Sequence, residues 1–265
     1  MPGPDADDLA LLKSALRQGG EIARSFFGTK VKTWDKAKGA PVTEADIAVN
    51  DLLRSQLTAA RPDYGWLSEE TEDDPARLSK TRVFVIDPID GTVSFMKGKP
   101  DFVISAAVVE AGLPRVAALL NPISGEFFEA VKGGGAKLDG RGIKPSVRQT
   151  IEGCRMLGSK SMFGHPAWPE PWPAMHIETR GSIAYRMALV ACGEFDAMMA
   201  LSTKRDWDLA AADLIVTEAG GRSTTHNGAS FHYNQASTIH PSVMCAGPEL
   251  YRALFERVGH LTLPR

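Results

Sequence analysis

The sequence predicts an α+β protein in which two helices, a meander of strands and a second α/β section follow one another. Apolar residues recur at helical intervals over about residues 7–27 and 43–57. Strand-like runs separated by glycine and proline come next, and from about residue 140 helical and strand-like patterns alternate again. We therefore expect an N-terminal α+β half over residues 1–140 and a C-terminal α/β half over residues 141–265.

The two N-terminal helices are predicted from their apolar spacing and from a capping motif. The first covers about residues 7–27, either unbroken or with a weak point at Gly19-Gly20, because glycine disfavours helix interiors. Its apolar positions are Leu9, Leu12, Leu16, Ile22, Ala23 and Phe26. The second helix begins at Thr43, where Thr43 and Asp46 resemble a capping box with Asp in place of the usual Glu.

The strands of the N-terminal half are predicted from β-branched and aromatic runs. Residues 83–86 form such a run, and we expect Pro88 to end this strand because proline cannot donate to the ladder. Three further runs cover residues 102–109, 116–120 and 126–131. Their short connections predict a mostly antiparallel meander.

The C-terminal half begins with a segment that has no clear periodicity. Residues 163–172 are rich in proline and tryptophan, and we expect a loop or lid there. The remaining expected elements are helices over 183–192, 208–219 and 248–258 and a strand over 196–200.

Composition and charge exclude several classes of partner. The 265 residues include 43% hydrophobic and 23% charged side chains, which is ordinary for a soluble globule with a sizeable core. The net charge of -2 gives no attraction for nucleic-acid polymers or anionic membranes. No apolar run is long enough to span a bilayer, and the acidic start differs from a signal peptide, so we expect a cytoplasmic protein.

The cysteines and histidines show no metal-binding spacing. Cys154, Cys192 and Cys245 are widely scattered, so we expect reduced and mostly buried thiols. The six histidines lack a pattern such as His-x-x-x-His, and we expect surface or packing roles for them.

The most informative motif places two carboxylates at the end of the expected strand over residues 83–86. Asp87 and Asp90 flank Ile89, so two carboxylates and one carbonyl surround a small volume, which suits a hard divalent cation. Gly91 and Thr92 then begin a helix whose free N–H groups can receive a phosphate. The alternative is a simple turn, because Asp, Pro and Gly are common turn residues.

Two other acidic clusters favour the metal site over the simple turn. Glu69 and Glu70 follow an apolar step, and Asp208 lies in the first turn of an expected helix. Taken singly, paired glutamates are usually solvated surface, and an Asp in a first helical turn usually interacts with the helix dipole. The joint occurrence of all three clusters is harder to explain in this way.

Together these segments resemble the inositol monophosphatase family of metal-dependent phosphatases, from about residue 38 to residue 221. The first family signature is Asp-Pro-x-Asp-Gly-Thr, then Phe, then Gly-x-Pro. Its counterparts here are the segment Asp87 to Thr92, then Phe95, Gly98 and Pro100. The second signature is Trp-Asp-x-Ala-Ala, then Glu-Ala-Gly-Gly. Its counterparts here are Trp207, Asp208, Ala210, Ala211, Glu218, Ala219, Gly220 and Gly221.

This resemblance implies a layered α/β/α/β/α sandwich of the inositol monophosphatase/fructose-1,6-bisphosphatase type. The two halves would meet at the active site, with most metal ligands in the first half and Asp208 and substrate selection in the second. A homodimer and inhibition by Li⁺ are further expectations from the family.

The resemblance also implies hydrolysis of a phosphomonoester by water that two or three Mg²⁺ ions activate. The implied metal ligands are Glu69, Asp87, the Ile89 carbonyl, Asp90 and Asp208. The implied catalytic residues are Asp46, Thr92 and Asp90, with Asp46 and Thr92 acting as one general-base relay. The alternative role for Asp46 is helix capping, and both roles are compatible. The amides of Gly91 and Thr92 would bind phosphate.

Substrate choice is predicted from differences within the family. Inositol monophosphatases have a Glu that binds sugar hydroxyls shortly after the strand expected here over residues 196–200, and this chain has no acid there. Lys204 and Arg205 follow, and either can pair with a second phosphate or lie in solvent. Gly181 and Ser182 would line the alcohol side of the substrate.

The segment over residues 38–43 resembles the Ser-Pro-Val-Thr form of 3′(2′),5′-bisphosphate nucleotidases and bacterial histidinol phosphatases. We therefore expect 3′-phosphoadenosine 5′-phosphate as substrate, hydrolysed to AMP and phosphate. The alternatives are inositol 1-phosphate, histidinol phosphate and a sugar bisphosphate. A non-catalytic binding or regulatory role is a further alternative, which the presence of every expected ligand disfavours.

Overall fold

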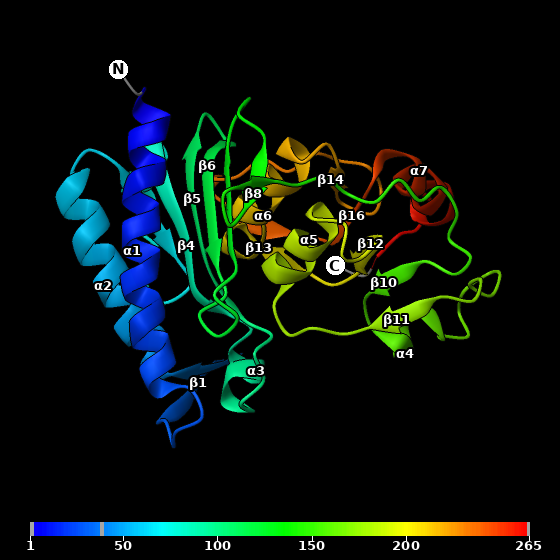
Figure 1. Cartoon of the computed structure of the whole chain (residues 1–265), viewed down its shortest axis with the longest axis horizontal. Coiled ribbons are helices and arrows are strands. Elements are labelled where there is room, and N and C mark those ends of the chain that lie inside the picture. The colour runs from blue at the N-terminus through cyan, green and yellow to red at the C-terminus, as the bar shows by residue number, and fades with distance from the viewer. Residues whose placement is uncertain (1–2, 38–39, 264–265) are drawn as a thin grey trace.

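The computed structural model describes residues 3–37 and 40–263, and these form five alternating layers of helices and sheets (Figure 1). Two helices lie outside a seven-stranded sheet, two more lie between this sheet and a five-stranded sheet, and a last helix covers the second sheet. The expected α/β/α/β/α sandwich is therefore confirmed.

The first layer consists of α1 (Pro4–Phe26) and α2 (Glu44–Ala60), which lie side by side. α1 continues through Gly19 and Gly20 without a break. A Cβ atom at Gly20 would lie only 2.7 Å from Cδ2 of Leu120, so the glycine allows the helix to approach the sheet closely. The expected capping box is present at the start of α2, where Thr43 is the N-cap and Asp46 the third helical residue.

The second layer is a seven-stranded sheet with the order β3-β4-β5-β6-β7-β8-β9. Its strands are β3 (Gly65–Ser68), β4 (Arg82–Asp90), β5 (Val103–Glu110), β6 (Leu113–Leu120), β7 (Phe127–Val131), β8 (Ala136–Leu138) and β9 (Arg141–Gly142). β3 pairs with β4 in parallel, and every other neighbouring pair is antiparallel, which confirms the predicted meander. Both faces are buried, since Phe84 and Ile86 pack toward α1 and α2, whereas Val83 and Val85 pack toward the third layer.

The prediction that Pro88 ends β4 is wrong. β4 runs to Asp90, because an irregularity in the register between Asp87 and Asp90 carries the strand past the proline. Proline is tolerated in strands at such irregular positions, where the ladder does not need its missing N–H.

The third layer is formed by α5 (Ile183–Ala191) and α6 (Asp206–Glu218), and the fourth by a sheet with the order β11-β10-β12-β16-β14. The strands of this sheet are β10 (Arg155–Leu157), β11 (His176–Glu178), β12 (Ala197–Ala200), β14 (Arg222–Thr224) and β16 (Val243–Ala246). α7 (Pro248–Val258) forms the outer layer. One apolar core joins the first sheet, the third layer and the second sheet. The division at residue 140 stays a prediction.

Several short elements connect the layers. They are the hairpin β1 (Thr33–Ala37) and β2 (Ala40–Thr43), the 3-10 helix η1 (Pro75–Ser79), α3 (Thr92–Met96), α4 (Lys160–Phe163) and the pair β13 (Lys204–Arg205) and β15 (Ile239–His240). Residues 38 and 39, part of the segment compared with nucleotidases, lie outside the described residues.

The proline- and tryptophan-rich segment after α4 is a loop, as predicted, and it is packed against the second sheet and α7. The ring of Trp172 makes edge contacts with the rings of Phe163 and Trp168, at centroid distances of 5.0 and 5.1 Å. The three cysteines are free, two buried and one half-buried, as expected. Among the described residues, no helix combines the length and apolarity needed to cross a membrane.

Candidate active site

The candidate active site lies where β4 ends. In the antiparallel ladder Asp87 pairs with Ser105, whereas Asp90 pairs with Val103, so β4 carries one extra residue in this interval. The N–H of Ile89 donates to Oδ1 of Asp87 at 3.0 Å, which fixes the tight turn between the two carboxylates. The bulge therefore places both side chains at one edge of the sheet.

Glu69 reaches the same edge because β3 runs parallel to β4. Ser68 pairs with Ile86, and the N–H of Glu69 donates to the Ile86 carbonyl at 3.2 Å, so Glu69 lies next to Asp87. The Ser68 hydroxyl donates to Oδ1 of the buried Asn50 on α2 at 2.7 Å. The position of Asn50 was not predictable, because nothing in the sequence relates α2 to the end of β3.

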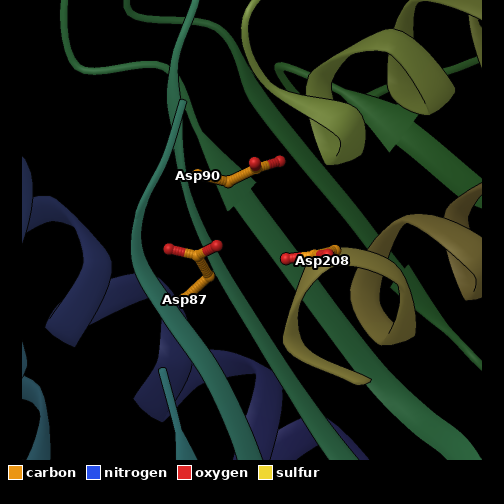
Figure 2. Close-up of side chains that lie close together, drawn as sticks. All are labelled: Asp87, Asp90 and Asp208. Atoms are coloured by element: carbon orange, nitrogen blue, oxygen red, sulfur yellow. The ribbon is translucent and has the colours of Figure 1, made fainter. Parts of the chain in front are cut away.

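Asp208 comes from the first turn of α6, on the other side of the site. Its Oδ2 accepts a hydrogen bond from the N–H of Arg205 at 2.8 Å, which fixes the carboxylate at the helix start. Figure 2 shows Asp87 and Asp90 facing Asp208 across a small gap. One oxygen from each of the three carboxylates lies within 4.8 Å of the others.

Burial and mutual repulsion make these carboxylates hard to ionise without a cation. Burial raises the pKa of Asp87 well above its usual value, and the charges of Glu69, Asp90 and Asp208 raise it further. Burial also raises the pKa of Asp90 to about 6, although hydrogen bonds to its carboxylate lower it. The pKa of Asp208 is raised to about 7, first by burial and then by the charge of Asp90.

The cluster fits a hard divalent cation. All the ligand atoms that it offers are carboxylate oxygens, and Mg²⁺ prefers oxygen ligands. Asp87, Asp90 and Asp208 would hold such an ion, and Glu69 lies close enough to raise the pKa of each of the three. The identity and number of the ions stay predictions.

Asp46 and Thr92 meet at one side of the carboxylate cluster, as the sequence predicts. Oδ2 of Asp46 accepts from the N–H and hydroxyl of Thr43, at 2.9 and 2.5 Å, while its Oδ1 lies 3.1 Å from the Thr92 hydroxyl oxygen. The capping and relay contacts are thus made by different oxygens of one carboxylate. Burial raises the pKa of Asp46 despite these hydrogen bonds.

Gly91 and Thr92 begin the short helix α3, as predicted. Gly91 has a φ of +106°, a left-handed conformation that other residues adopt only with strain. A Cβ atom there would lie 3.0 Å from the Asp101 carbonyl oxygen and 3.1 Å from the amide nitrogen of Ser182. Phosphate binding by the amides of Gly91 and Thr92 stays a prediction.

Ser182, expected to line the alcohol side of the substrate, contacts Asp90, one of the expected metal ligands. It is fully buried, its hydroxyl donates to Oδ2 of Asp90 at 2.6 Å, and the same hydroxyl accepts from the N–H of Tyr185 at 2.8 Å. The N–H of Ala184 also donates to Oδ2 of Asp90 at 2.6 Å. Ser182 therefore caps α5 and orients Asp90, and direct substrate binding by this residue stays a prediction.

A cavity of about 470 Å³ opens between α4, α5 and β12, and two of its lining residues, Gly181 and Ile183, flank Ser182, which donates to Asp90. Gly181 and Lys204 line it, and substrate binding by these two residues stays a prediction. Arg186, which the sequence analysis did not single out, lines the same cavity. The predicted helix over residues 183–192 includes Arg186. The sequence does not show that Arg186 and Lys204 line one cavity, because this depends on the fold.

Arg205 lies on the other side of the site from Lys204. It lines a separate hollow with Glu69 and Trp207, and its guanidinium lies 5.9 Å from the centre of the Trp207 ring. Neighbouring residues of a strand point in opposite directions, which explains the separation. Lys204 and Arg205 thus line different hollows, and the binding of a second phosphate by either residue stays a prediction.

A model of the inositol monophosphatase family matches residues 6–259. The chain belongs to this family. It is 29% identical over 267 residues to the inositol-1-monophosphatase of Rhizobium meliloti (strain 1021), and the match covers 93% of each chain. It is 31% identical over 230 residues to the Nus factor SuhB of Xylella fastidiosa (strain Temecula1 / ATCC 700964), covering 83% of this chain and 82% of that one. The crystal structure of the extragenic suppressor protein suhB from Bartonella henselae superposes with a TM-score of 0.84 at 25% identity, covering 97% of this chain and 100% of that chain.

Membership of the inositol monophosphatase family and the phosphatase-named relatives identify the protein as a phosphomonoester hydrolase. A divalent ion bound by the carboxylates would neutralise phosphate charge and activate water. When the Thr92 hydroxyl donates to Asp46, its oxygen can still accept a hydrogen bond from an attacking water. Asp46 could then take up the proton that the water loses. The general-base relay through Thr92 and Asp46 stays a prediction.

Proposed function

We propose that this inositol monophosphatase-family protein hydrolyses a small phosphorylated metabolite with the aid of Mg²⁺ held by Glu69, Asp87, Asp90 and Asp208. The observation that supports this most is the convergence of three carboxylates from β4 and α6 within 4.8 Å of one another. The Asp46–Thr92 pair beside them supplies the expected general-base relay. We keep two or three ions, Li⁺ inhibition, a homodimer and a cytoplasmic location as parts of the proposal.

Two substrates have specific support. Inositol 1-phosphate is favoured by relatives such as the inositol-1-monophosphatase of Rhizobium meliloti (strain 1021). A nucleotide 3′,5′-bisphosphate, the substrate predicted from the sequence, is supported by the cavity: its wall of described residues contains no Asp or Glu, and Lys204 adds a positive charge. An acid would accept hydrogen bonds from polyol hydroxyls, whereas a cation favours an anionic group.

Phosphate release with Mg²⁺ from four esters tests the proposal. The esters are 3′-phosphoadenosine 5′-phosphate, inositol 1-phosphate, histidinol phosphate and fructose 1,6-bisphosphate. A preference of about a hundredfold in kcat/KM, or about 2.7 kcal/mol, identifies the substrate class. Absence of release from all four would instead favour a binding role, in line with the relative named Nus factor SuhB.

A further inference from the structure

Two cationic side chains line the cavity between α4, α5 and β12. Arg186 comes from α5 and Lys204 from β13, and both line the cavity of about 470 Å³. The rest of the wall is largely apolar or small: Met162, Gly181, Ile183, Met199, Ala200 and Leu201. Cations in such a setting are unusual, because apolar surroundings weaken their hydration.

Arg186 is oriented by a backbone carbonyl rather than by an acid. Its Nε donates to the Arg180 carbonyl at 2.7 Å, and its Nη2 donates to the same oxygen. Arg180 in turn pairs with Glu178 at 2.9 Å and with Asp101 at 3.5 Å. The guanidinium of Arg186 is thus fixed along one edge without neutralisation of its charge.

Lys204 is also held by neutral groups. Its Nζ donates to the hydroxyl and carbonyl of Ser202, at 2.9 and 3.2 Å, and to the Thr203 carbonyl at 2.9 Å. Within residues 3–37 and 40–263, neither Arg186 nor Lys204 forms an ion pair. No acid neutralises either charge there, and an anion from outside the chain would take one of the N–H groups that Lys204 now directs at Ser202 and Thr203.

The electrostatics of the cavity agree with this arrangement. Burial lowers the pKa of Arg186, and burial and then repulsion from Arg186 are among the causes that lower the pKa of Lys204. The carboxylates that favour the two charges are Asp90 and Asp101 for Arg186 and Asp208 and Asp90 for Lys204, and we expect Asp90 and Asp208 to hold a cation of their own. An anion between Arg186 and Lys204 would relieve both the desolvation and the mutual repulsion.

We propose that Arg186 and Lys204 form a subsite for a second anionic group on the alcohol part of the substrate. The reacting phosphate would lie at Asp87, Asp90 and Thr92, and the cavity receives what is attached to it. Its volume suits a nucleoside or sugar unit, and its apolar wall suits a ring. The inference rests on the proposed phosphatase function, and it restricts the substrate to esters that carry another phosphate, sulfate or carboxylate.

Matched pairs of esters test the subsite. Adenosine 3′,5′-bisphosphate and adenosine 3′-monophosphate differ only in the second phosphate, as do fructose 1,6-bisphosphate and fructose 1-phosphate. We expect the bisphosphate of one pair to be preferred by at least about thirtyfold in kcat/KM, mainly through KM. The preferred pair shows whether a nucleoside or a sugar carries the second anion, and equal rates within both pairs would overturn the subsite.

Variants assign the preference to the two cations. In Arg186→Met or Lys204→Met the ratio of kcat/KM within the preferred pair should fall by about tenfold or more. Arg186→Lys, which keeps the charge, should retain part of the ratio. Arg252→Met is the matched control, because Arg252 is 67% exposed on α7, and it should keep the full ratio. An unchanged ratio in Arg186→Met and Lys204→Met, with normal thermal unfolding, would contradict the proposal.

A binding measurement separates the subsite from the phosphatase function. Adenosine 5′-monophosphate carries only the second anion, and its binding to the metal-free protein in EDTA can be followed by calorimetry together with ribose 5-phosphate. Binding of either compound that weakens about tenfold in Arg186→Met supports the subsite even if no ester is hydrolysed. If the protein hydrolyses both members of each ester pair equally, and Arg186→Met binds adenosine 5′-monophosphate and ribose 5-phosphate as the wild type does, the subsite is refuted. The phosphatase function would still stand in that case.

Discussion

Asp90→Asn should have opposite effects on activity and on the stability of the metal-free protein. The substitution removes a carboxylate that we expect to bind Mg²⁺, so kcat/KM should fall by more than about a hundredfold. The fold should remain intact, because the Asn oxygen can still accept from the Ser182 hydroxyl and the Ala184 N–H, which now donate to Asp90.

The gain in stability follows from the pKa of Asp90. Burial raises this pKa from the ordinary 3.8 to about 6, so the folded protein binds a proton more tightly there than the unfolded chain does. The contribution of the protonated Asp90 to the free energy of unfolding is fully present below pH 3.8 and is lost as the pH rises through about 6. At pH 8 the ionised carboxylate therefore lowers the free energy of unfolding by up to about 3 kcal/mol, and Asn avoids this loss.

Urea unfolding in EDTA measures the effect. We expect Asp90→Asn to raise the free energy of unfolding at pH 8 and to leave it nearly unchanged below the ordinary pKa of Asp. Excess Mg²⁺ should reverse the order at pH 8, because only the wild-type site gains fully from binding the ion. Asp63→Asn is the control, since Asp63 is exposed. A metal-free variant less stable than the wild type at pH 8 would refute the reasoning.

Further predictions concern the residues around Asp90. Ser182→Ala removes the 2.6 Å hydrogen bond to Asp90 and should weaken Mg²⁺ binding by about 10–100-fold in calorimetry; equal affinity would count against the positioning role. Thr92→Val should lower kcat by about a hundredfold while Thr92→Ser retains most of it, and a Val variant of normal kcat would exclude the relay. Gly91→Ala introduces a side chain at a φ of +106° and should lower the free energy of unfolding by about 1–3 kcal/mol, so an unchanged urea midpoint would contradict it. Because the pKa of Asp208 is about 7 and that of Asp90 about 6, Mg²⁺ binding should release more protons at pH 6 than at pH 8. The observed binding enthalpy at pH 6 should therefore depend on the ionisation enthalpy of the buffer, and the same enthalpy in every buffer would be inconsistent with this release.

The sequence predicts most of the fold because its local signals agree with the tertiary structure. The last helix, Pro248–Val258, has the predicted bounds, and Thr43 caps α2 through the predicted box with Asp46. In contrast, proline at position 88 signals the end of a strand only if the ladder is regular there. The irregularity between Asp87 and Asp90 involves pairing with β5, which a local motif does not describe.

The candidate site was predictable where one short segment supplies its parts. Asp87, Ile89 and Asp90 are neighbours in sequence, so their convergence follows from a turn. Contacts between distant segments were not predictable from spacing alone, such as the hydrogen bond from Ser182 to Asp90, which joins residues 92 positions apart. For the same reason the residues around the substrate cavity were assigned only partly, and Arg186 was missed.

The start of α5 links the substrate cavity to the carboxylate cluster. Gly181 lines the cavity, and Ser182, the next residue, holds Asp90 through its hydroxyl. Arg186 lies one turn further along the same helix and faces the cavity. A shift of α5 that followed an anion bound by Arg186 would therefore also move the Ser182 hydroxyl, which donates to the expected metal ligand Asp90. Ser182 contacts Asp90 directly, whereas Arg186 lines the cavity, so we expect substitutions of Arg186 to alter mainly KM and those of Ser182 mainly kcat.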